Sequence, residues 1–322
     1  MAPFRPLLHP LPIPEGQRRS PALPIRRPPL AVTIRDGLSL STWLLLGGLL
    51  QGAAVAAFGY RSLLPTTLIL GYRALDTLLM TLNLKRNHYM DGVVMQKYSA
   101  QYPNADGSFS TTINATTGSE DGDPAAKPLI VFHLGAKCNH PLGLFAPGYK
   151  ELGDWAEKMH ESLRDNPDKY GLLGMTRFLG QSDAAGNESL VIMYMRDYEG
   201  LHRFAHDQLH AEGVRWWAEI VKAHPHLAIW HETYVVPKGC WENIYAQAKV
   251  TGMGDTFFPV VDGEGEGRVK EWARGAVDAR GGALRTGSRR LKMKHLEEKE
   301  SELEAYYDQT DGGEVLYRLD RI

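Results

Sequence analysis

Cysteine is nearly absent from this sequence of 322 residues, which contains only Cys138 and Cys240. Two cysteines cannot form a disulfide framework, and neither has a CxxC partner or the spacing of a zinc site. The scarcity of cysteine therefore favours a reducing compartment, in which a buried thiol packs as a small apolar group.

An excess of charge of one sign is also absent, because 36 lysines and arginines nearly balance 38 aspartates and glutamates. A nearly neutral chain has no global field that gathers nucleic acid, so we expect no nucleic-acid partner. The sequence also lacks the GxGxxG and GxxxxGK[ST] phosphate loops and the GxSxG nucleophile elbow. These absences argue against a nucleotide-binding enzyme and against an α/β-hydrolase.

The most apolar segment is residues 41–60, STWLLLGGLLQGAAVAAFGY, which carries no charge. Twenty helical residues at about 1.5 Å each are just long enough for a hydrocarbon core of roughly 30 Å. Its glycines would weaken a soluble helix but are common in membrane helices. We therefore expect a membrane span here.

A second apolar run, residues 63–84, contains Arg73 and Asp76, whose i, i+3 spacing would allow them to pair. Charges at mid-membrane depth are costly, so this run is interpreted as an interfacial helix or as the returning arm of a hairpin. A buried pair of soluble helices is the remaining alternative. Arginines before the first run favour a cytosolic arm, and Lys85 and Arg86 would return the chain to that side. The prediction is a membrane protein whose main domain faces the cytoplasm.

Composition divides the chain into five parts. The expected parts are a disordered Pro/Arg-rich arm (1–36), a membrane anchor (37–86), a linker and loop (87–127), a globular domain (128–260) and a charged tail (261–322) that is disordered or a solvated helix.

The globular domain shows a regular alternation of predicted elements. Buried strands are expected at residues 127–137, 172–180, 189–197 and 227–236, and helices at 148–164 and 198–223. The order β-α-β-β-α-β is the ferredoxin-like pattern of an α+β fold, with both helices on one face of an antiparallel sheet. The other face needs cover, and a second copy could supply it. We therefore expect a homodimer, as in the dimeric α+β barrels.

Three short segments could carry chemistry. His202, His206 and His210 are spaced by four, which places neighbours on one helix face. Two such histidines can hold a metal in an HExxH helix, but the carboxylate of that motif is missing, so no metal site is predicted. The histidines could instead serve catalysis or substrate binding, or simply occupy the surface or the core.

The other two segments are WHETY at residues 230–234 and NHPLG at residues 139–143. Alternation on a strand places Trp230, Glu232 and Tyr234 on one face and His231 on the other. Polar groups on a central strand suggest a lined cavity, although they could equally satisfy helix ends or a dimer contact. Asn139 and His140 follow the first strand, where they could form a turn or face a pocket.

The strings FHLGAKCNHPLG (132–143), FAHDQLHAEGVRWW (204–217) and IWHETYVVP (229–237) together resemble a known group. They are similar to the fungal membrane-anchored monooxygenases of the fumagillin-cluster type, a branch of the antibiotic-biosynthesis-monooxygenase-like dimeric α+β barrels. The resemblance covers about residues 35–260. It implies a ferredoxin-like dimer that oxidises a lipophilic secondary metabolite with O2 and without a cofactor.

In such an enzyme the substrate anion itself reduces O2, and the protein must supply a base and exclude water. A histidine suits the base. The resemblance therefore suggests His206 or His210 as the base, with His231 and Glu232 as its orienting partners. Trp217, Trp230 and Tyr234 would line an apolar pocket, with Asn139 and His140 at its mouth.

Two other functions stay open at this point. Haem enzymes of the aldoxime-dehydratase type share this kind of barrel, and a histidine-rich helix could supply an axial ligand. A non-catalytic membrane-associated binding protein could also keep the fold, because fold alone does not decide activity.

Overall fold

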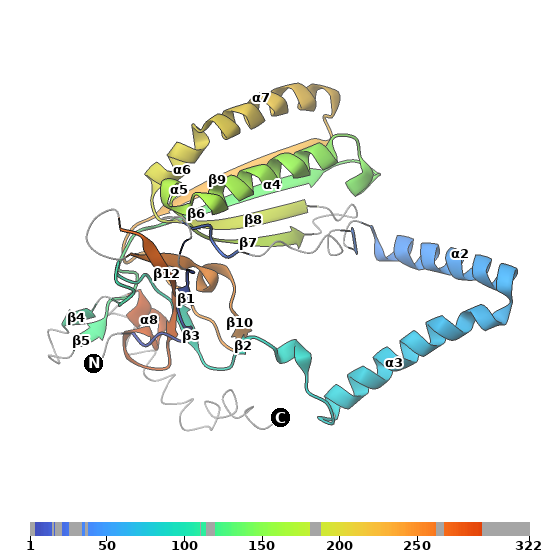
Figure 1. Cartoon of the computed structure of the whole chain (residues 1–322), viewed down its shortest axis with the longest axis horizontal. Helices are drawn as coiled ribbons and strands as arrows, with labels where there is room; N and C mark the ends of the chain where they lie inside the picture. The colour runs from blue at the N-terminus through green and yellow to red at the C-terminus, as the bar shows by residue number, and fades with distance from the viewer. Residues whose placement is uncertain are drawn as a thin grey trace.

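The computed structural model describes residues 4–14, 16, 21–25, 34–35, 38–109, 111–113, 120–180, 188–261 and 267–291. Its centre is a four-stranded antiparallel sheet of order β7-β8-β6-β9, built from β6 (Leu129–Cys138), β7 (Leu172–Gly180), β8 (Glu188–Met195) and β9 (Leu227–Val236). Helices α4 (Tyr149–Asp165), α6 (Tyr198–Ala205) and α7 (Gln208–Ala223) lie over one face (Figure 1). The ferredoxin-like α+β fold and the order of its elements are confirmed.

One predicted element is divided. The expected helix at 198–223 ends at Ala205, and α7 begins at Gln208. The break falls where the Asp207 side chain accepts a hydrogen bond from the backbone N–H of Leu209 and so caps α7. Because of this break, His202 and His210 lie on two different helices, and His206 ends the first of them.

A second layer of short strands packs beside the main sheet. β11 (Phe257–Val261) and β1 (Leu11–Pro12) flank β12 (Val269–Arg274) in one antiparallel sheet. The remaining short elements are the strand pairs β3 (Tyr98–Ala100) with β13 (Ala276–Asp278), β2 (Val93–Val94) with β10 (Ala248–Lys249) and β4 (Thr111–Ile113) with β5 (Glu120–Gly122), and the helical turns α5 (Pro167–Tyr170) and α8 (Gly287–Arg290).

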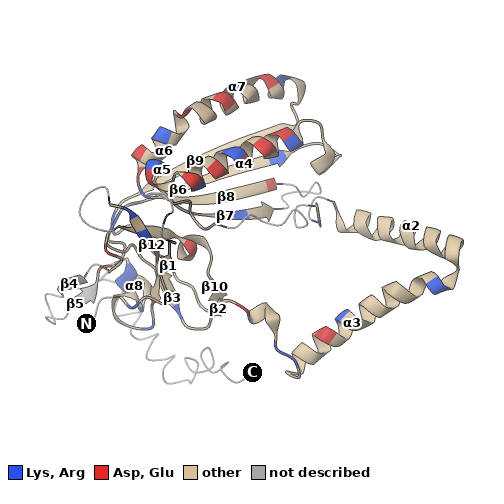
Figure 2. Ribbon diagram, in the orientation of Figure 1, with Lys and Arg blue, Asp and Glu red and all other residues tan. Residues whose placement is uncertain are grey.

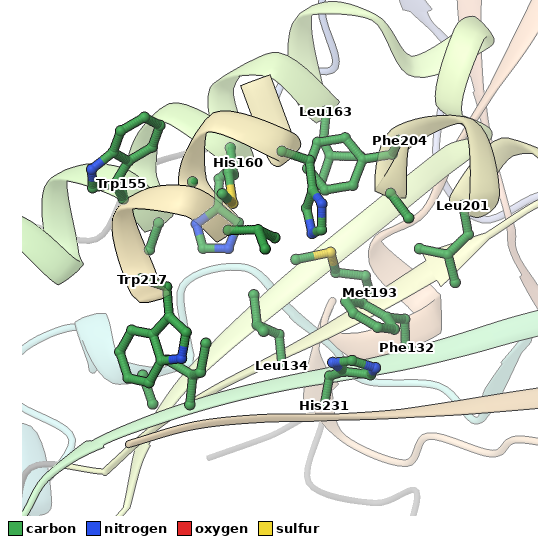
Figure 3. A pocket seen from close by; sticks show the side chains of 18 of the residues that line it. Phe132, Leu134, Trp155, His160, Leu163, Met193, Leu201, Phe204, Trp217 and His231 are labelled. Atoms are coloured by element: carbon green, nitrogen blue, oxygen red, sulfur yellow. The ribbon is translucent and has the colours of Figure 1, made fainter. Parts of the chain in front are cut away.

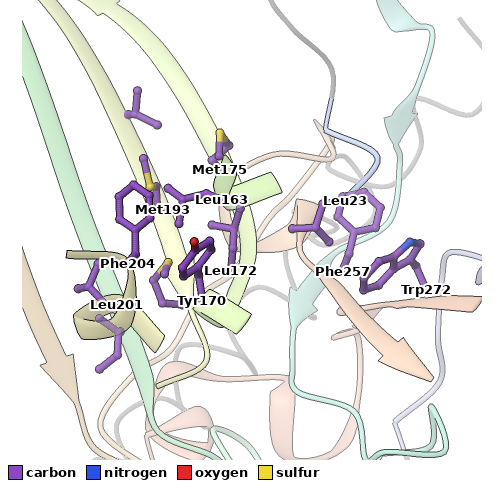
Figure 4. Close-up of a cluster of buried hydrophobic side chains, with 13 residues drawn as sticks. Leu23, Leu163, Tyr170, Leu172, Met175, Met193, Leu201, Phe204, Phe257 and Trp272 are labelled. Carbon is purple, nitrogen blue, oxygen red and sulfur yellow. The ribbon is translucent and has the colours of Figure 1, made fainter. Parts of the chain in front are cut away.

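This second layer corrects three predicted boundaries. The described part of the N-terminal arm is ordered on the domain: Leu23 is 2% exposed and shares a core with Leu163, Phe257 and Trp272 (Figure 4). Residues 98–102, expected in a linker, are buried as well. The physical reason is that prolines and polar residues do not prevent short strands from pairing once their apolar side chains find a core.

The charged tail is corrected only in part. Residues 269–278 form β12 and β13, and Arg290 is buried with its guanidinium bonded to Glu242. The predicted solvated helix at the end of the chain lies outside the described residues.

The two apolar runs form a helical hairpin that projects from the domain (Figure 1). Helix α2 (Leu40–Phe58) is long and apolar enough to cross a membrane, and none of its residues is buried. A tight turn at 60–62 leads into α3 (Leu63–Thr81), and charged residues are sparse along both helices (Figure 2). Asp76 forms its ion pair with Lys85 instead of the expected Arg73, because the chain folds back after α3.

Candidate active site

A cavity of about 320 Å³ lies between the main sheet and its helices. Trp155 and His160 come from α4, whereas Phe132, Leu134 and His231 come from strands and face them across the cavity (Figure 3). Most of the wall is apolar, and among the described residues it includes no Asp, Glu, Lys or Arg. Such a site suits a largely hydrophobic ligand that is oriented by a few polar groups.

The helices leave this space because of the residues at their contact. Gly213 of α7 faces Met159 of α4, and a Cβ added at Gly213 would lie 2.2 Å from the Met159 Cε atom. Trp155 and Trp216 meet with ring centroids 5.9 Å apart. The missing side chain of Gly213 thus makes room for Met159, while the two tryptophan rings meet between the helices.

His210 occupies the first turn of α7 and lines the cavity. Its ring lies edge-on to Phe204, with centroids 5.5 Å apart. Burial lowers the pKa of His210 below its usual value, and the nearby His231 lowers it further, against a raising effect of its hydrogen bond with Ala205. His210 is therefore a neutral imidazole at pH 7 and can accept a proton.

His231 reaches the same cavity from β9. In the register of the sheet it lies opposite Leu134, and Thr233 lies opposite Phe132, so all four face the helices. The His231 ring is 5.6 Å from the Phe132 ring. Three of the histidines singled out from the sequence thus line one cavity, namely His202, His210 and His231, and Trp217 lines it as well.

His206 does not line the cavity. Its side chain is exposed at the break between α6 and α7, and its Nδ1 atom lies 2.9 Å from the carbonyl oxygen of His202. Of the two histidines suggested as a base, only His210 is in a position to serve.

Glu232, Trp230 and Tyr234 lie on the opposite face of the sheet. The Tyr234 hydroxyl donates to the Glu232 carboxylate at 2.8 Å, and His133 Nδ1 lies 3.6 Å from that carboxylate. The Trp230 indole covers Gly135, where an added Cβ would lie 2.0 Å from its ring. The expectation that Glu232 orients a catalytic histidine of this cavity, and that Trp230 and Tyr234 line it, is wrong because strand alternation turns these three side chains away.

Asn139 and His140 form a turn and do not line the cavity. The backbone N–H of Asn139 donates to the His226 carbonyl at 2.7 Å, and His140 Nδ1 accepts from the backbone N–H of Leu142 at 3.1 Å. These contacts agree with the prediction that NHPLG forms a turn. They do not agree with the prediction that Asn139 and His140 lie at the mouth of the pocket.

Sequence reasoning missed His160. It lies 6% exposed on α4, and its Nδ1 atom is 3.1 Å from a guanidinium nitrogen of Arg177 on β7. Arg177 in turn donates to Glu157 at 2.9 Å. A signal was present, because His160 follows Met159 and precedes Leu163 on the apolar stripe of the predicted helix, where a polar residue is out of pattern.

The described residues offer no three-ligand metal site and no cation for the propionates of haem. Within the described parts of the chain, no group of three His, Cys, Asp or Glu side chains could hold a metal ion. Haem carries two propionates, and the described cavity wall offers no Lys or Arg to receive them. The wall does hold histidines that could ligate haem iron, and a Soret band in the purified protein would reveal bound haem.

The structural comparisons find related shapes at low similarity. An aldoxime dehydratase, OxdRE, matches at 18% identity with a TM-score of 0.33 over 41% of this chain and 41% of its own. SnoaB, a cofactor-independent oxygenase from Streptomyces nogalater, matches at 13% identity with a TM-score of 0.23 over 33% of this chain and 90% of its own. Scores this low do not distinguish between the activities of these proteins.

The sequence comparisons are stronger. The family described as Monooxygenase af470-like matches residues 129–253, which contain the whole main sheet and the three helices that line the cavity, α4, α6 and α7. Monooxygenase af470 of Aspergillus fumigatus is 31% identical over 261 residues, which cover 78% of this chain and 86% of that protein. The chain therefore belongs to the af470-like family of monooxygenases.

Proposed function

We propose that this protein oxidises a lipophilic secondary metabolite with O2, without a cofactor, and that His210 is the base that removes a proton from the substrate. The observation that carries the proposal is a neutral, half-buried His210 in an apolar cavity within a chain of a monooxygenase family. His231, at the strand side of the same cavity, is the group available to position the substrate.

The chemistry balances without an external reductant. His210 takes one proton from an acidic methylene, and the resulting carbanion gives one electron to O2. The radical pair combines to a peroxide anion, which takes the proton back from His210. The hydroperoxide then loses water and leaves a carbonyl, so that CH2 and O2 become C=O and H2O. The substrate supplies all the electrons, and the bound substrate itself would have to cover the exposed part of the wall to keep bulk water from the radical pair.

The direct test is oxygen uptake by the purified full-length chain with dithranol, an anthrone with an acidic methylene. We expect one O2 consumed per quinone formed, without added NAD(P)H, flavin or metal. Uptake that equals the uncatalysed background with dithranol and with a panel of other enolisable aromatic ketones would count against this chemistry.

We also propose that α2 and α3 enter a membrane from the side that holds the domain and return to it. Leu23 before the hairpin and Tyr98 after it are both buried in the domain, which supports a chain that enters the membrane and returns to the same side. At about 1.5 Å per residue, each 19-residue helix is about 28 Å long. The arginine-rich arm favours the cytosolic side. A membrane-embedded hairpin would keep the cavity close to lipid-dissolved substrate.

Cysteine labelling tests this topology. In a Cys240→Ser background, we expect Leu38→Cys and Arg86→Cys both to react with a membrane-impermeant maleimide in sealed microsomes, because both flank the hairpin on the cytosolic side. Tyr60→Cys, at the hairpin tip, should stay unreacted until the membrane is dissolved. Labelling of positions 38 and 86 from opposite sides would rule out the hairpin.

A homodimer remains our proposal for the open face of the main sheet. Trp230, Tyr234 and Phe178 are 36%, 47% and 48% exposed there. Exposed aromatic side chains on one sheet face are typical of an interface. Sedimentation velocity should give a dimer for the native chain and a monomer for Trp230→Asp, and a native monomer would refute the proposal.

A further inference from the structure

His160 lines the cavity, and one of its ring nitrogens is buried without a partner. Its side chain is almost fully buried and lines the cavity from α4 (Figure 3). Among the residues that the structure describes, none forms a hydrogen bond with its Nε2 atom. A buried polar atom that lacks a partner is costly, so such an atom in a ligand cavity points to a group that the ligand brings.

The other ring nitrogen fixes which tautomer is present. Arg177 lies 3.1 Å from His160 Nδ1, and a guanidinium can only donate, so Nδ1 must be the acceptor. Glu157 holds Arg177 in place through a hydrogen bond of 2.9 Å. The proton of the neutral ring is therefore on Nε2, and this N–H donor has no acceptor among the described residues.

The ring also stays neutral. Burial, and then the adjacent Arg177, lower the pKa of His160 to about 4, and Glu157 opposes this only in part. At pH 7 the cavity thus contains a fixed, uncharged N–H group with a guanidinium behind it. The guanidinium polarises the ring and strengthens the bond that this N–H can donate.

We propose that His160 Nε2–H binds an oxygen atom of the lipophilic ligand, a carbonyl oxygen that becomes an enolate when the substrate is deprotonated. This rests on the function proposed above in that the ligand is the substrate of that reaction. The remaining wall is mainly apolar, so one oxygen acceptor on an otherwise hydrophobic molecule is the chemistry that it recognises. A donor placed where negative charge develops stabilises the enolate more than the ketone, and this assists proton removal.

Two probes that differ in the acceptor test the proposal by binding alone. 2-Acetonaphthone carries a carbonyl, and 2-ethylnaphthalene has the same ring system without it. Equilibrium dialysis of the full chain in lipid nanodiscs, with empty nanodiscs as the blank, gives the affinity ratio of ketone to hydrocarbon. We expect His160→Phe to lower this ratio about tenfold, which is what one buried hydrogen bond typically contributes.

Two further variants sharpen the result. His160→Gln can accept from Arg177 through Oε1 and donate into the cavity through Nε2, so it should keep the ratio of the native chain. His206→Phe makes the same substitution at an exposed histidine outside the cavity and should also keep it. A His160→Phe ratio equal to that of the native chain overturns the proposal.

NMR of the native chain provides an independent readout if His160→Phe does not fold. With ¹⁵N-labelled histidine, His160 should show the Nε2–H tautomer, and its signal should shift with 2-acetonaphthone but not with 2-ethylnaphthalene. The Nδ1–H tautomer, or equal shifts with both probes, overturns the proposal. Because these readouts need no turnover, a chain that binds the ketone through His160 but consumes no O2 would refute only the oxygenase function.

Discussion

Replacement of His210 by Gln should lower kcat for O2-dependent oxidation of dithranol by about 10² or more, the usual contribution of a positioned general base. The amide keeps polarity and approximate size but cannot take a proton at neutral pH. Oxygen electrode traces and quinone absorbance measure the rate. The half-buried position of His210 in the cavity and its lowered pKa are the reasons for choosing it over the other histidines.

The pH dependence of kcat for the native enzyme should show the titration of His210. The base must be neutral to act, so activity is at its plateau above the pKa of His210 and falls as the pH drops through it. Because burial lowers that pKa from the usual value of 6.5, the acid limb of kcat should lie below pH 6.5. His231 and His206 push the pKa in the same direction, whereas Asp207 raises it.

His206→Gln is the matched control, because His206 is the same residue type four positions earlier but is exposed outside the cavity. We expect its kcat to remain close to that of the native chain and its acid limb to move only slightly upward, because His206 lowers the pKa of His210 less than burial does. If kcat fell as much in His206→Gln as in His210→Gln, His210 could no longer be assigned as the base.

Gly213→Leu should close the cavity. We expect it to reduce kcat/KM for dithranol by at least as large a factor as His210→Gln reduces kcat. A Cβ at this position already lies 2.2 Å from Met159 Cε and 3.5 Å from the Trp155 ring. The Met159 thioether can move, but the extra side-chain atoms then occupy space that the ligand needs. The expected result is a loss of about 10² or more in kcat/KM with a modest loss of stability, because overpacking costs about 1–3 kcal/mol and the helix propensity of leucine offsets only about 1 kcal/mol of it.

Gly153→Leu is the control for that substitution. Gly153 is also a helical glycine, on α4, but a Cβ there meets nothing within 4 Å. Both variants should gain helix propensity, and only Gly213→Leu should lose activity. Thermal unfolding of both chains separates a blocked cavity from a damaged fold, and equal activity losses would show that the cavity is not the site.

The sheet and its helices could be predicted from the sequence, because the spacing of apolar residues along a strand or helix is a local property of the chain. Strands such as residues 172–180 and 227–236 match the structure at both ends, since apolar runs bounded by turn residues define them. The helix break at His206 was missed because the cap at Asp207 competes with a helical pattern that continues through it.

The candidate site was predicted only in part: His231 lines the cavity, whereas its neighbour Glu232 does not. Strand alternation explains this difference. Alternation correctly separates His231 from Glu232, but it does not say which face the helices cover. The resemblance led us to group both residues at one site, and the sheet places them on opposite faces. Similarly, no local pattern reveals that Arg177 on a strand would meet His160 on a helix 17 residues earlier.

The sequence by itself therefore determined the ferredoxin-like order, the apolar hairpin segments and the monooxygenase relationship, because each depends on residues that are close in the chain or on shared motifs. Only the tertiary structure decided that the N-terminal arm completes the core, that His210 and not His206 lines the cavity, and that Arg177 holds His160 at the same cavity. These features depend on contacts between distant segments, whose burial and pairing energies exist only once the chain has folded.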